Sequence, residues 1–361
     1  MKKQICSLLL ACSYMSFCFE SGYSVTDTND VVFKYNENEI KPIASLTKVM
    51  NVMVTLDMVK QGLVKLDDYV TITRPMTLIN ESGIDIKVGD RIRLSDLLKA
   101  QLVYSANNAA YAVAYYVSNN NLDKFIELMN KKAVQLDMKN TTFYTPAGLP
   151  TRYTRMPLDV STASDLSKMA RHALEYPEIL QFSSLKSIKI NGKSYKNRNK
   201  ILGIEGNFGM KTGFHNLSGF NMIGVSKING LTLINITLDD KTDKEKFKSQ
   251  LELSKHFKEK LVKLFKKDQY YAKLNVKNSK EKTIDTRLSS DFYYLNSQVK
   301  VYEKIYNLSG SIEKNSKVGE ISIYSLNNKL ITKIDILAST STRKLNIFER
   351  ILKFFGLMWE V

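Results

Sequence analysis

The fold is decided by the stretches Ala44-Ser45-Leu46-Thr47-Lys48, Ser105-Ala106-Asn107 and Lys211-Thr212-Gly213. Ser-x-x-Lys and Ser-x-Asn patterns also occur elsewhere in the chain, whereas the Lys-Thr-Gly triplet occurs once. Each pattern is weak alone, so we judge them by their sequence context and by their fixed order within one predicted domain.

The context of Ser45 predicts a position in the first turn of a buried helix. Pro42 precedes it, and apolar residues follow at helical spacing, namely Leu46, Val49, Met50 and Met53. Residues three apart share a helix face, so the amine of Lys48 can approach the Ser45 hydroxyl. Burial and a second nearby cation can lower a lysine pKa enough to make it a base, and the helix N-terminus favours an oxyanion.

The other two stretches are predicted on a loop and on a strand. Ser105 and Asn107 follow a predicted helix over 94–103, on a loop that re-enters a helix at 109–117, and such a loop suits a proton relay. The Lys-Thr-Gly triplet precedes two strand-like runs, 220–225 and 231–238, which an Asn-Gly turn joins. We therefore expect the triplet to begin an exposed sheet edge that can pair with an extended peptide.

Composition predicts an ordinary folded protein with an anionic partner. The chain has 361 residues, 43% hydrophobic and 25% charged, which excludes general disorder and leaves room for two or three domains. Its 53 Lys and Arg against 36 Asp and Glu give a formal charge of +17. Nucleic acid, lipid headgroups and acidic polymers all fit that charge.

The N-terminal residues 1–20 are predicted to be a signal peptide, cleaved near residues 16–21. Lys2 and Lys3 precede an uncharged run over 5–19, which is shorter than the roughly 20 apolar residues of a membrane span. All three cysteines, Cys6, Cys12 and Cys18, lie in this segment, so a mature chain without it has no disulfide or thiolate site. A lipobox reading of residues 9–12, with lipidation of Cys12, is the less favoured alternative.

Beyond the signal segment we predict two domains and a terminal helix. The catalytic domain is placed at 24–266, with an amphipathic helix over 243–267 at its end, and a β-rich domain at 270–342, where apolar and polar residues alternate. Residues 343–361 are assigned to a membrane-anchor helix. Its segment 345–359 confines its polar side chains to one stripe and is too short to cross a bilayer, so it is expected to lie in the interface.

These stretches resemble the serine D-alanyl-D-alanine carboxypeptidases, the low-molecular-mass penicillin-binding proteins, whose motif set is Ser-x-x-Lys, Ser-x-Asn and Lys-Thr-Gly. Further matching segments are LLKAQLVYSANNAAYAVA from Leu97, TTFYTPAGLP from Thr141, TASDLSKMARHAL from Thr162 and the NRNKILG approach to the triplet. The resemblance covers most of the chain. It implies an α+β fold: a serine β-lactamase/DD-peptidase-like catalytic domain with an antiparallel sheet flanked by helices, a small β-rich domain and a C-terminal amphipathic helix.

The resemblance also implies a role for each motif residue. Ser45 is expected to be the acylated nucleophile, Lys48 its base and Ser105 a proton relay. Asn107, Lys211, Thr212 and Gly213 form the substrate-binding set: Asn107 hydrogen-bonds the peptide, Lys211 supports the relay and Thr212 binds the terminal carboxylate. The backbone N–H groups of Ser45 and Phe214 are the expected oxyanion hole.

Some residues depart from the family pattern or stay open. Ala106 and Asn108 stand where the family usually has Gly and Asp, and Lys246 stands where an Arg before a Phe is common. An Arg-to-Lys change weakens a bidentate carboxylate contact, so substrate affinity rather than reaction type is affected. His215 is expected either to line the pocket or to be a packing residue.

The implied activity is removal of the terminal D-Ala from peptidoglycan stem pentapeptides through an acyl-enzyme, in cell-wall maturation and cell shape, at the outer face of the cytoplasmic membrane. Stem peptides, β-lactam antibiotics and the membrane surface are the expected partners, with no metal, organic cofactor or nucleic acid.

The alternatives are a serine β-lactamase and an inactive envelope-binding protein of the same fold. A class A β-lactamase uses a Glu to activate water for deacylation, yet residues 128–174 contain no Glu. The intact motif side chains argue against the inactive protein. A P-loop is excluded because Met210, rather than Gly, precedes the motif lysine, and the three histidines form no H-E-x-x-H metal motif.

Overall fold

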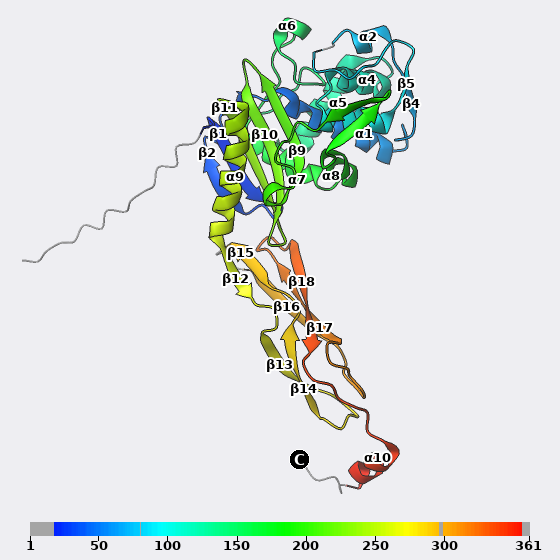
Figure 1. The fold of residues 1–361 in the computed structure, drawn as a ribbon, viewed down its shortest axis with the longest axis vertical. Helices are drawn as coiled ribbons and strands as arrows, with labels where there is room; N and C mark the ends of the chain where they lie inside the picture. The colour runs from blue at the N-terminus through cyan, green and yellow to red at the C-terminus, as the bar shows by residue number, and fades with distance from the viewer. Residues whose placement is uncertain (1–17, 80, 296–298, 356–361) are drawn as a thin grey trace, which may run out of the picture.

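The computed structural model describes residues 18–79, 81–295 and 299–355. The molecule is elongated, with a mixed helix and sheet domain at one end, a β-rich domain next to it and the last helix at the far end (Figure 1). This order agrees with the fold predicted from the motifs.

A five-stranded antiparallel sheet forms the centre of the first domain, in the order β2-β1-β11-β10-β9. The strands are β1 (Ser21–Thr26), β2 (Val31–Tyr35), β9 (Asn207–His215), β10 (Gly219–Ile228) and β11 (Leu231–Asp240). Asn229 and Gly230, both with positive φ, form the hairpin turn between β10 and β11. The predicted hairpin is therefore confirmed, and β9, which carries the Lys-Thr-Gly triplet, lies at the sheet edge.

Helices cover both faces of this sheet. On one face lies α9 (Asp243–Lys260), against β10 and β11, and on the other lie α7 (Ala163–Ala173) and α8 (Pro177–Ser183). Beyond them pack α1 (Thr47–Lys60), α3 (Leu94–Val103), α4 (Asn107–Val117) and α5 (Leu122–Gln135). The predicted helix over 94–103 is confirmed, whereas the next helix begins at Asn107 rather than at residue 109.

Short elements complete the first domain. They are β3 (Lys41–Pro42), the 3₁₀ turn η1 (Ala44–Leu46), β4 (Tyr69–Thr71), α2 (Arg74–Thr77), β5 (Arg91–Arg93), α6 (Thr151–Thr154), β6 (Val160–Ser161), β7 (Ser187–Ile190), β8 (Lys193–Lys196) and η2 (Ile204–Gly206).

The helix predicted over 243–267 is too long. The α-helix ends at Lys260, and the next five residues form β12 (Leu261–Phe265), which pairs with β15 (Phe292–Leu295). Leucine, valine and phenylalanine also suit a strand, and tertiary pairing with β15 decides the conformation there. Leu264, which belongs to the apolar face of the predicted helix, is 38% exposed.

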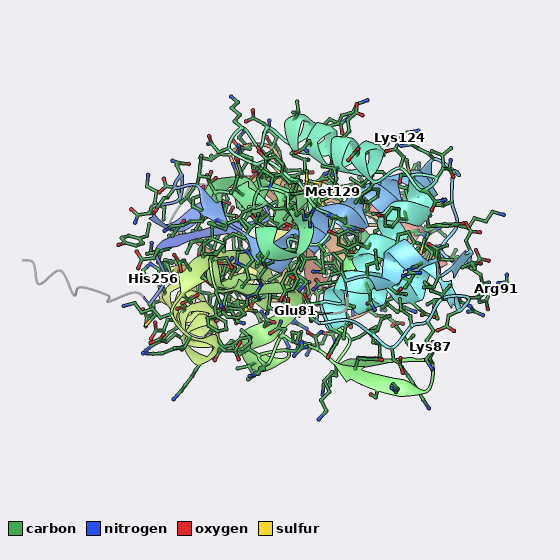
Figure 2. All side chains as sticks on the ribbon, turned by 90° about the horizontal axis from the view of Figure 1, so that it is seen from above. Glu81, Lys87, Arg91, Lys124, Met129 and His256 are labelled. Atoms are coloured by element: carbon green, nitrogen blue, oxygen red, sulfur yellow. The ribbon has the colours of Figure 1, made fainter. Side chains whose placement is uncertain are left out.

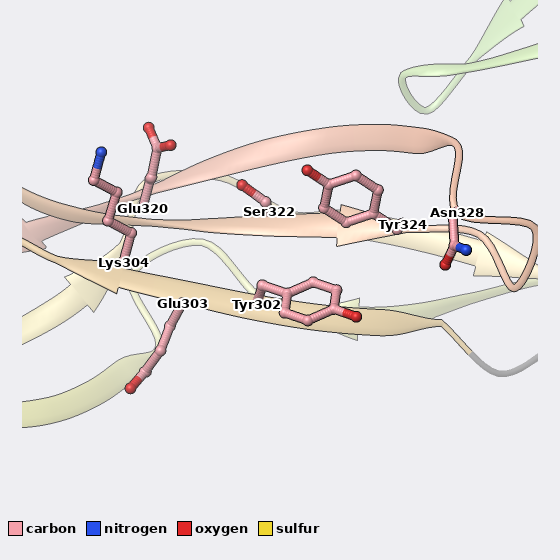
Figure 3. Close-up of a pocket in the computed structure, with 7 residues that line it drawn as sticks. All are labelled: Tyr302, Glu303, Lys304, Glu320, Ser322, Tyr324 and Asn328. Atoms are coloured by element: carbon pink, nitrogen blue, oxygen red, sulfur yellow. The ribbon is translucent and has the colours of Figure 1, made fainter.

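The second domain is a sheet structure, as the alternation predicted. A five-stranded sheet has the order β13-β14-β18-β17-β16. Its strands are β13 (Tyr270–Asn275), β14 (Thr283–Leu288), β16 (Lys300–Ile305), β17 (Lys317–Tyr324) and β18 (Leu330–Ala338). The outer face of β16 and β17 carries a hollow of about 410 Å³ beside Tyr302 and Tyr324, with Glu303 directed to the opposite side (Figure 3).

Both ends of the described chain bear on predictions. Residues 1–17 of the predicted signal segment lie outside the described part. The Glu20 N–H donates to a carbonyl of β11, and the Cys18 carbonyl accepts a hydrogen bond from the backbone just after β11. The last helix, α10 (Ile347–Phe354), begins at a capping box in which Asn346 and Glu349 satisfy each other's backbone N–H groups. It is shorter than the predicted 345–359, and Trp359 lies outside the described residues.

Candidate active site

One cleft of about 700 Å³ in the first domain brings the three motifs together. Its walls include Ser45 from η1, Ser105 and Asn107 from the junction of α3 and α4, and Thr212 and Gly213 from β9. These residues are far apart in the sequence, so the sheet and helix packing creates the site. Every sequence-predicted site residue lies in this cleft or hydrogen-bonds to a residue that lines it.

Ser45 and Lys48 form a direct hydrogen bond at the start of α1. The Lys48 ammonium donates to Ser45 Oγ at 2.7 Å, to Asn107 Oδ1 at 2.8 Å and to the Ala147 carbonyl at 2.7 Å. The three donors of the ammonium are thus satisfied although the side chain is fully buried. Burial lowers the pKa of Lys48 to about 7, which makes the neutral amine accessible near neutral pH.

A second lysine supports Ser105. Lys211 Nζ donates to Ser105 Oγ at 2.9 Å and to the Thr212 carbonyl at 2.6 Å. Burial, followed by the charges of Lys48, Lys246 and Arg198, lowers the pKa of Lys211 well below its usual value. Ser105 itself has a φ of 68°, a left-handed conformation that a serine rarely adopts. The loop thereby holds its hydroxyl in the cleft.

The edge of β9 lies against η1, and this contact explains Gly213. A Cβ added at this glycine would lie 2.9 Å from the Ile43 carbonyl oxygen and 3.2 Å from the Ser45 nitrogen. Only glycine lets the strand approach the backbone of Ser45 so closely. The next residue, Phe214, directs a half-exposed side chain onto Phe220 at a ring distance of 4.1 Å.

A buried carboxylate that the sequence analysis did not identify, Asp159, hydrogen-bonds to the residue before Lys48 at the start of α1. Asp159 is fully buried and accepts hydrogen bonds from Thr47 Oγ1 at 2.9 Å, from the backbone N–H of Tyr144 at 2.7 Å, and from both the N–H and hydroxyl of Thr145 at 2.9 Å. It joins the start of α1 to the 144–149 loop, whose Ala147 carbonyl receives Lys48. The family resemblance includes the neighbouring segment 141–150 but assigns no role to Asp159.

Two residues that the sequence left open also lie in the cleft. His215 is 9% exposed, its Nδ1 is buried with no hydrogen-bond partner among the described residues, and burial lowers its pKa. Lys246 is 3% exposed and pairs with Asp243 at 2.8 Å. The cleft is therefore lined by a further cation, Lys246, at the position where the family pattern commonly has an arginine.

Comparison with known sequences gives two family matches and two informative relatives. Residues 25–242 match the family model described as D-alanyl-D-alanine carboxypeptidase, and residues 260–344 match that of the penicillin-binding protein 5 C-terminal domain. D-alanyl-D-alanine carboxypeptidase DacF of Bacillus subtilis is 25% identical over 337 residues, which cover 88% of this chain and 84% of that protein. DacC of Escherichia coli is 33% identical over 227 residues, covering 60% of this chain and 55% of its own.

Solved structures match either most of this chain or about two thirds of it. Penicillin-binding protein 5 from Haemophilus influenzae matches with a TM-score of 0.65 and 23% identity, covering 91% of this chain and 98% of that one. Penicillin-binding protein D2 from Listeria monocytogenes, in an ampicillin-bound form, matches with a TM-score of 0.61 and 26% identity over 67% of this chain and 98% of its own. The predicted combination of catalytic domain and β-rich domain is confirmed.

Proposed function

The chain belongs to the D-alanyl-D-alanine carboxypeptidase family, and from this premise we propose that Ser45, Lys48 and Ser105 carry its reaction. As a member, it is a penicillin-binding serine carboxypeptidase that acts on D-Ala-D-Ala in peptidoglycan maturation, and its family acts in the periplasm or extracytoplasmic space. The observation that carries the residue roles is the contact of the buried Lys48 amine with Ser45 Oγ at 2.7 Å.

In the proposed acylation, neutral Lys48 takes the proton of Ser45 Oγ as this oxygen attacks the carbonyl between the two D-Ala residues. The oxyanion receives the backbone N–H groups of Ser45 and Phe214. The C–N bond then breaks, and the departing D-Ala amine takes a proton through Ser105, which Lys211 supports at 2.9 Å. Water later adds to the ester, and D-Ala-terminated tetrapeptide leaves as Ser45 regains its proton.

The proposed substrate contacts use the remaining cleft residues. The terminal carboxylate binds the Thr212 hydroxyl and the charge of Lys246, while the open edge of β9 at Gly213 pairs with the peptide backbone. Asn107 is proposed to hydrogen-bond the substrate. Its amide also joins Lys48 Nζ at 2.8 Å to the Glu81 carbonyl at 2.5 Å, which connects the base to the opposite wall of the cleft.

Labelling of the purified chain with a fluorescent penicillin tests these roles. We expect a covalent adduct that Ser45→Ala eliminates, because the nucleophile is lost. Ser341→Ala is the matched control: this serine also begins a Ser-x-x-Lys pattern but lies in the β-rich part, where its Oγ accepts the Lys314 N–H at 2.9 Å. A labelled Ser45→Ala protein would contradict the assignment of the nucleophile.

Persistence of the adduct separates this function from a β-lactamase. The chain has no Glu between residues 128 and 174 to activate the deacylating water, so the penicilloyl ester is expected to persist for hours. Rapid turnover without an adduct would favour the β-lactamase, and no reaction at all would favour the inactive envelope-binding protein.

We further propose the division into 1–20, 24–266, 270–342 and 343–361, with export by the first segment and peripheral membrane anchoring by the last. None of the described helices is long and apolar enough to cross a membrane. In α10, Ile347, Phe348 and Phe354 are 79%, 69% and 85% exposed, with Arg350 and Lys353 on the same short helix. Such a pattern suits an interfacial helix on anionic lipid.

Sedimentation with vesicles of phosphatidylglycerol and phosphatidylethanolamine tests the anchor. Full-length chain should sediment with the vesicles, and Phe348→Ser with Phe354→Ser should release it. The matched control is Tyr302→Ser, which removes an exposed aromatic from the β-rich domain. Equal sedimentation of all three proteins would contradict anchoring by α10.

A further inference from the structure

A charged cluster that the proposed chemistry does not use lies at one end of the active-site cleft. Glu81 and Arg152 form an ion pair there, with Oε1 and Nη2 3.6 Å apart, and their side chains are 50% and 60% exposed. The Arg152 guanidinium stacks on Tyr153 at 4.6 Å, and a hydrogen bond with Glu81 raises the pKa of the Tyr153 hydroxyl. Figure 2 labels Glu81, close to helices drawn in cyan.

His215 adds an unsatisfied polar group to this end of the cleft. Its side chain is more than nine-tenths buried and lines the same cleft, and Nδ1 has no hydrogen-bond partner among the described residues. Arg152 lines the same cleft, and after burial its positive charge also lowers the pKa of His215. A buried polar atom without a partner is costly unless a ligand or water satisfies it.

The direction of β9 places a particular part of the substrate at this cluster. The strand runs from the carboxylate-binding Thr212 through Phe214 to His215. A peptide that pairs antiparallel with this edge has its C-terminus at Thr212, so the residues before the scissile bond pass Phe214 and His215. The residue third from the start of the stem, immediately before D-Ala-D-Ala, then lies next to the cluster of Glu81 and Arg152.

We propose that Glu81 and Arg152 form a subsite for the side chain of this third stem residue and select a side chain that ends in both an ammonium and a carboxylate. This inference rests on the proposed function. Diaminopimelate has both groups, with the ammonium matching Glu81 and the carboxylate matching Arg152, for which a guanidinium offers two parallel donors. A lysine side chain supplies only the ammonium and leaves Arg152 facing a second cation.

The existing ion pair does not oppose this exchange. An exposed Arg–Glu pair contributes little free energy because water screens it, so replacing the mutual contact by two ligand contacts costs little. The half-exposed ring of Phe214 offers apolar surface to the methylene groups of the side chain. The alternative is that the pair has only a structural role and links α6 to the segment at residue 81. The experiment must distinguish this role from substrate selection.

The test compares release of D-Ala from pentapeptides that differ only in the third residue: diaminopimelate, diaminopimelate with its side-chain carboxyl amidated, and lysine. For the wild-type chain we expect kcat/KM for diaminopimelate to exceed that for the other two by about tenfold, a typical effect of one charge pair. Arg152→Gln should reduce this ratio to near one. Glu81→Gln should lower kcat/KM for all three peptides, because all contain the ammonium.

Arg343→Gln is the matched control, since Arg343 also pairs with a glutamate, Glu349, at 2.5 Å, but near α10. Its substrate ratio should equal that of the wild type. Equal rates on diaminopimelate and lysine in the wild type would overturn the proposal, as would an Arg152→Gln protein that loses stability and slows on every peptide with the ratio unchanged. Penicillin labelling, which involves no third residue, reports separately whether the proposed function itself fails.

Discussion

At the residue scale, the proposed reaction depends on two buried lysines with different contacts. Lys48 donates to Ser45 Oγ and Lys211 donates to Ser105 Oγ. Burial lowers the pKa of both lysines, and the positive charge of Lys48 lowers the pKa of Lys211 further. Under the proposed roles, Lys48 therefore serves as a base near neutral pH, and no histidine is required.

The titration of Lys48 predicts the pH dependence of acylation. Below its pKa of about 7 the side chain is an ammonium and cannot accept the Ser45 proton, so the rate should rise as pH increases through this value. At one unit below the pKa only about a tenth of the molecules carry the neutral amine. Stopped-flow measurement of penicillin acylation between acidic and mildly alkaline pH checks this, and a rate that falls with pH across neutrality would contradict it.

Asp159 is expected to act as a positioning residue for Lys48. Its negative charge raises the pKa of the lysine against the larger effect of burial, so Asp159→Asn should move the rising limb of the pH profile to lower pH. The loss of anionic acceptors for Thr47 and Thr145 should also lower the acylation rate, by about tenfold.

Asp165→Asn provides the control, because Asp165 is equally buried but bonds to Asn140 and Thr141, away from Lys48. It should lower the melting temperature without moving the profile. An unmoved profile in Asp159→Asn, with only reduced stability, would mean that Asp159 is structural.

At the element scale, close backbone approaches hold the nucleophile. Ala44 has a φ of 47°, and Gly148, with a φ of 74°, passes so near that an added Cβ would lie 1.9 Å from the Ala44 carbonyl oxygen. The 144–149 loop and η1 therefore form one unit, and the loop carbonyl at Ala147 binds Lys48. Residues in rare conformations are tolerated where surrounding packing fixes them.

Gly148→Ala should consequently reduce the free energy of unfolding by about 2–4 kcal/mol and slow penicillin acylation, because the loop must move away from Ala44. Gly62→Ala is the control: its φ is also positive, at 72°, but nothing lies within 4 Å of the added Cβ. That change should cost only about 1 kcal/mol and leave acylation unchanged. Denaturant unfolding measures the loss of stability in each variant, and penicillin labelling measures its acylation rate. An equal loss of stability in both variants would contradict a steric clash between the Cβ added at Gly148 and Ala44.

At the scale of the whole molecule, the two domains share a hydrophobic cluster. Val32, Leu233 and Phe257 of the first domain pack in one buried group with Tyr294 of β15. The Tyr294 hydroxyl donates to Asp30 Oδ2 at 2.6 Å. An apolar, hydrogen-bonded interface of this kind restricts relative motion of domains, so the β-rich domain should hold the catalytic cleft at a fixed height above α10.

A rigid junction predicts a single unfolding transition in scanning calorimetry. Tyr294→Ala removes a side chain that is 1% exposed and should either split this transition or lower its midpoint by several degrees, since such truncations cost about 3–5 kcal/mol. Tyr302→Ala, at a 58% exposed position of the β-rich domain, serves as control and should leave the transition unchanged. Two separate transitions in the wild type would contradict the rigid junction.

The sequence by itself determined the motifs, the β10–β11 hairpin and the alternating strands of the second domain, because these depend on local periodicity and turn residues. It did not reveal that the helix ends at Lys260, where pairing with β15 outweighs the helical pattern. Only the tertiary structure showed Asp159 bonded to Thr47 at the start of α1 and Glu81 paired with Arg152. Such contacts join segments distant in the chain, and a single sequence carries no local signal for them.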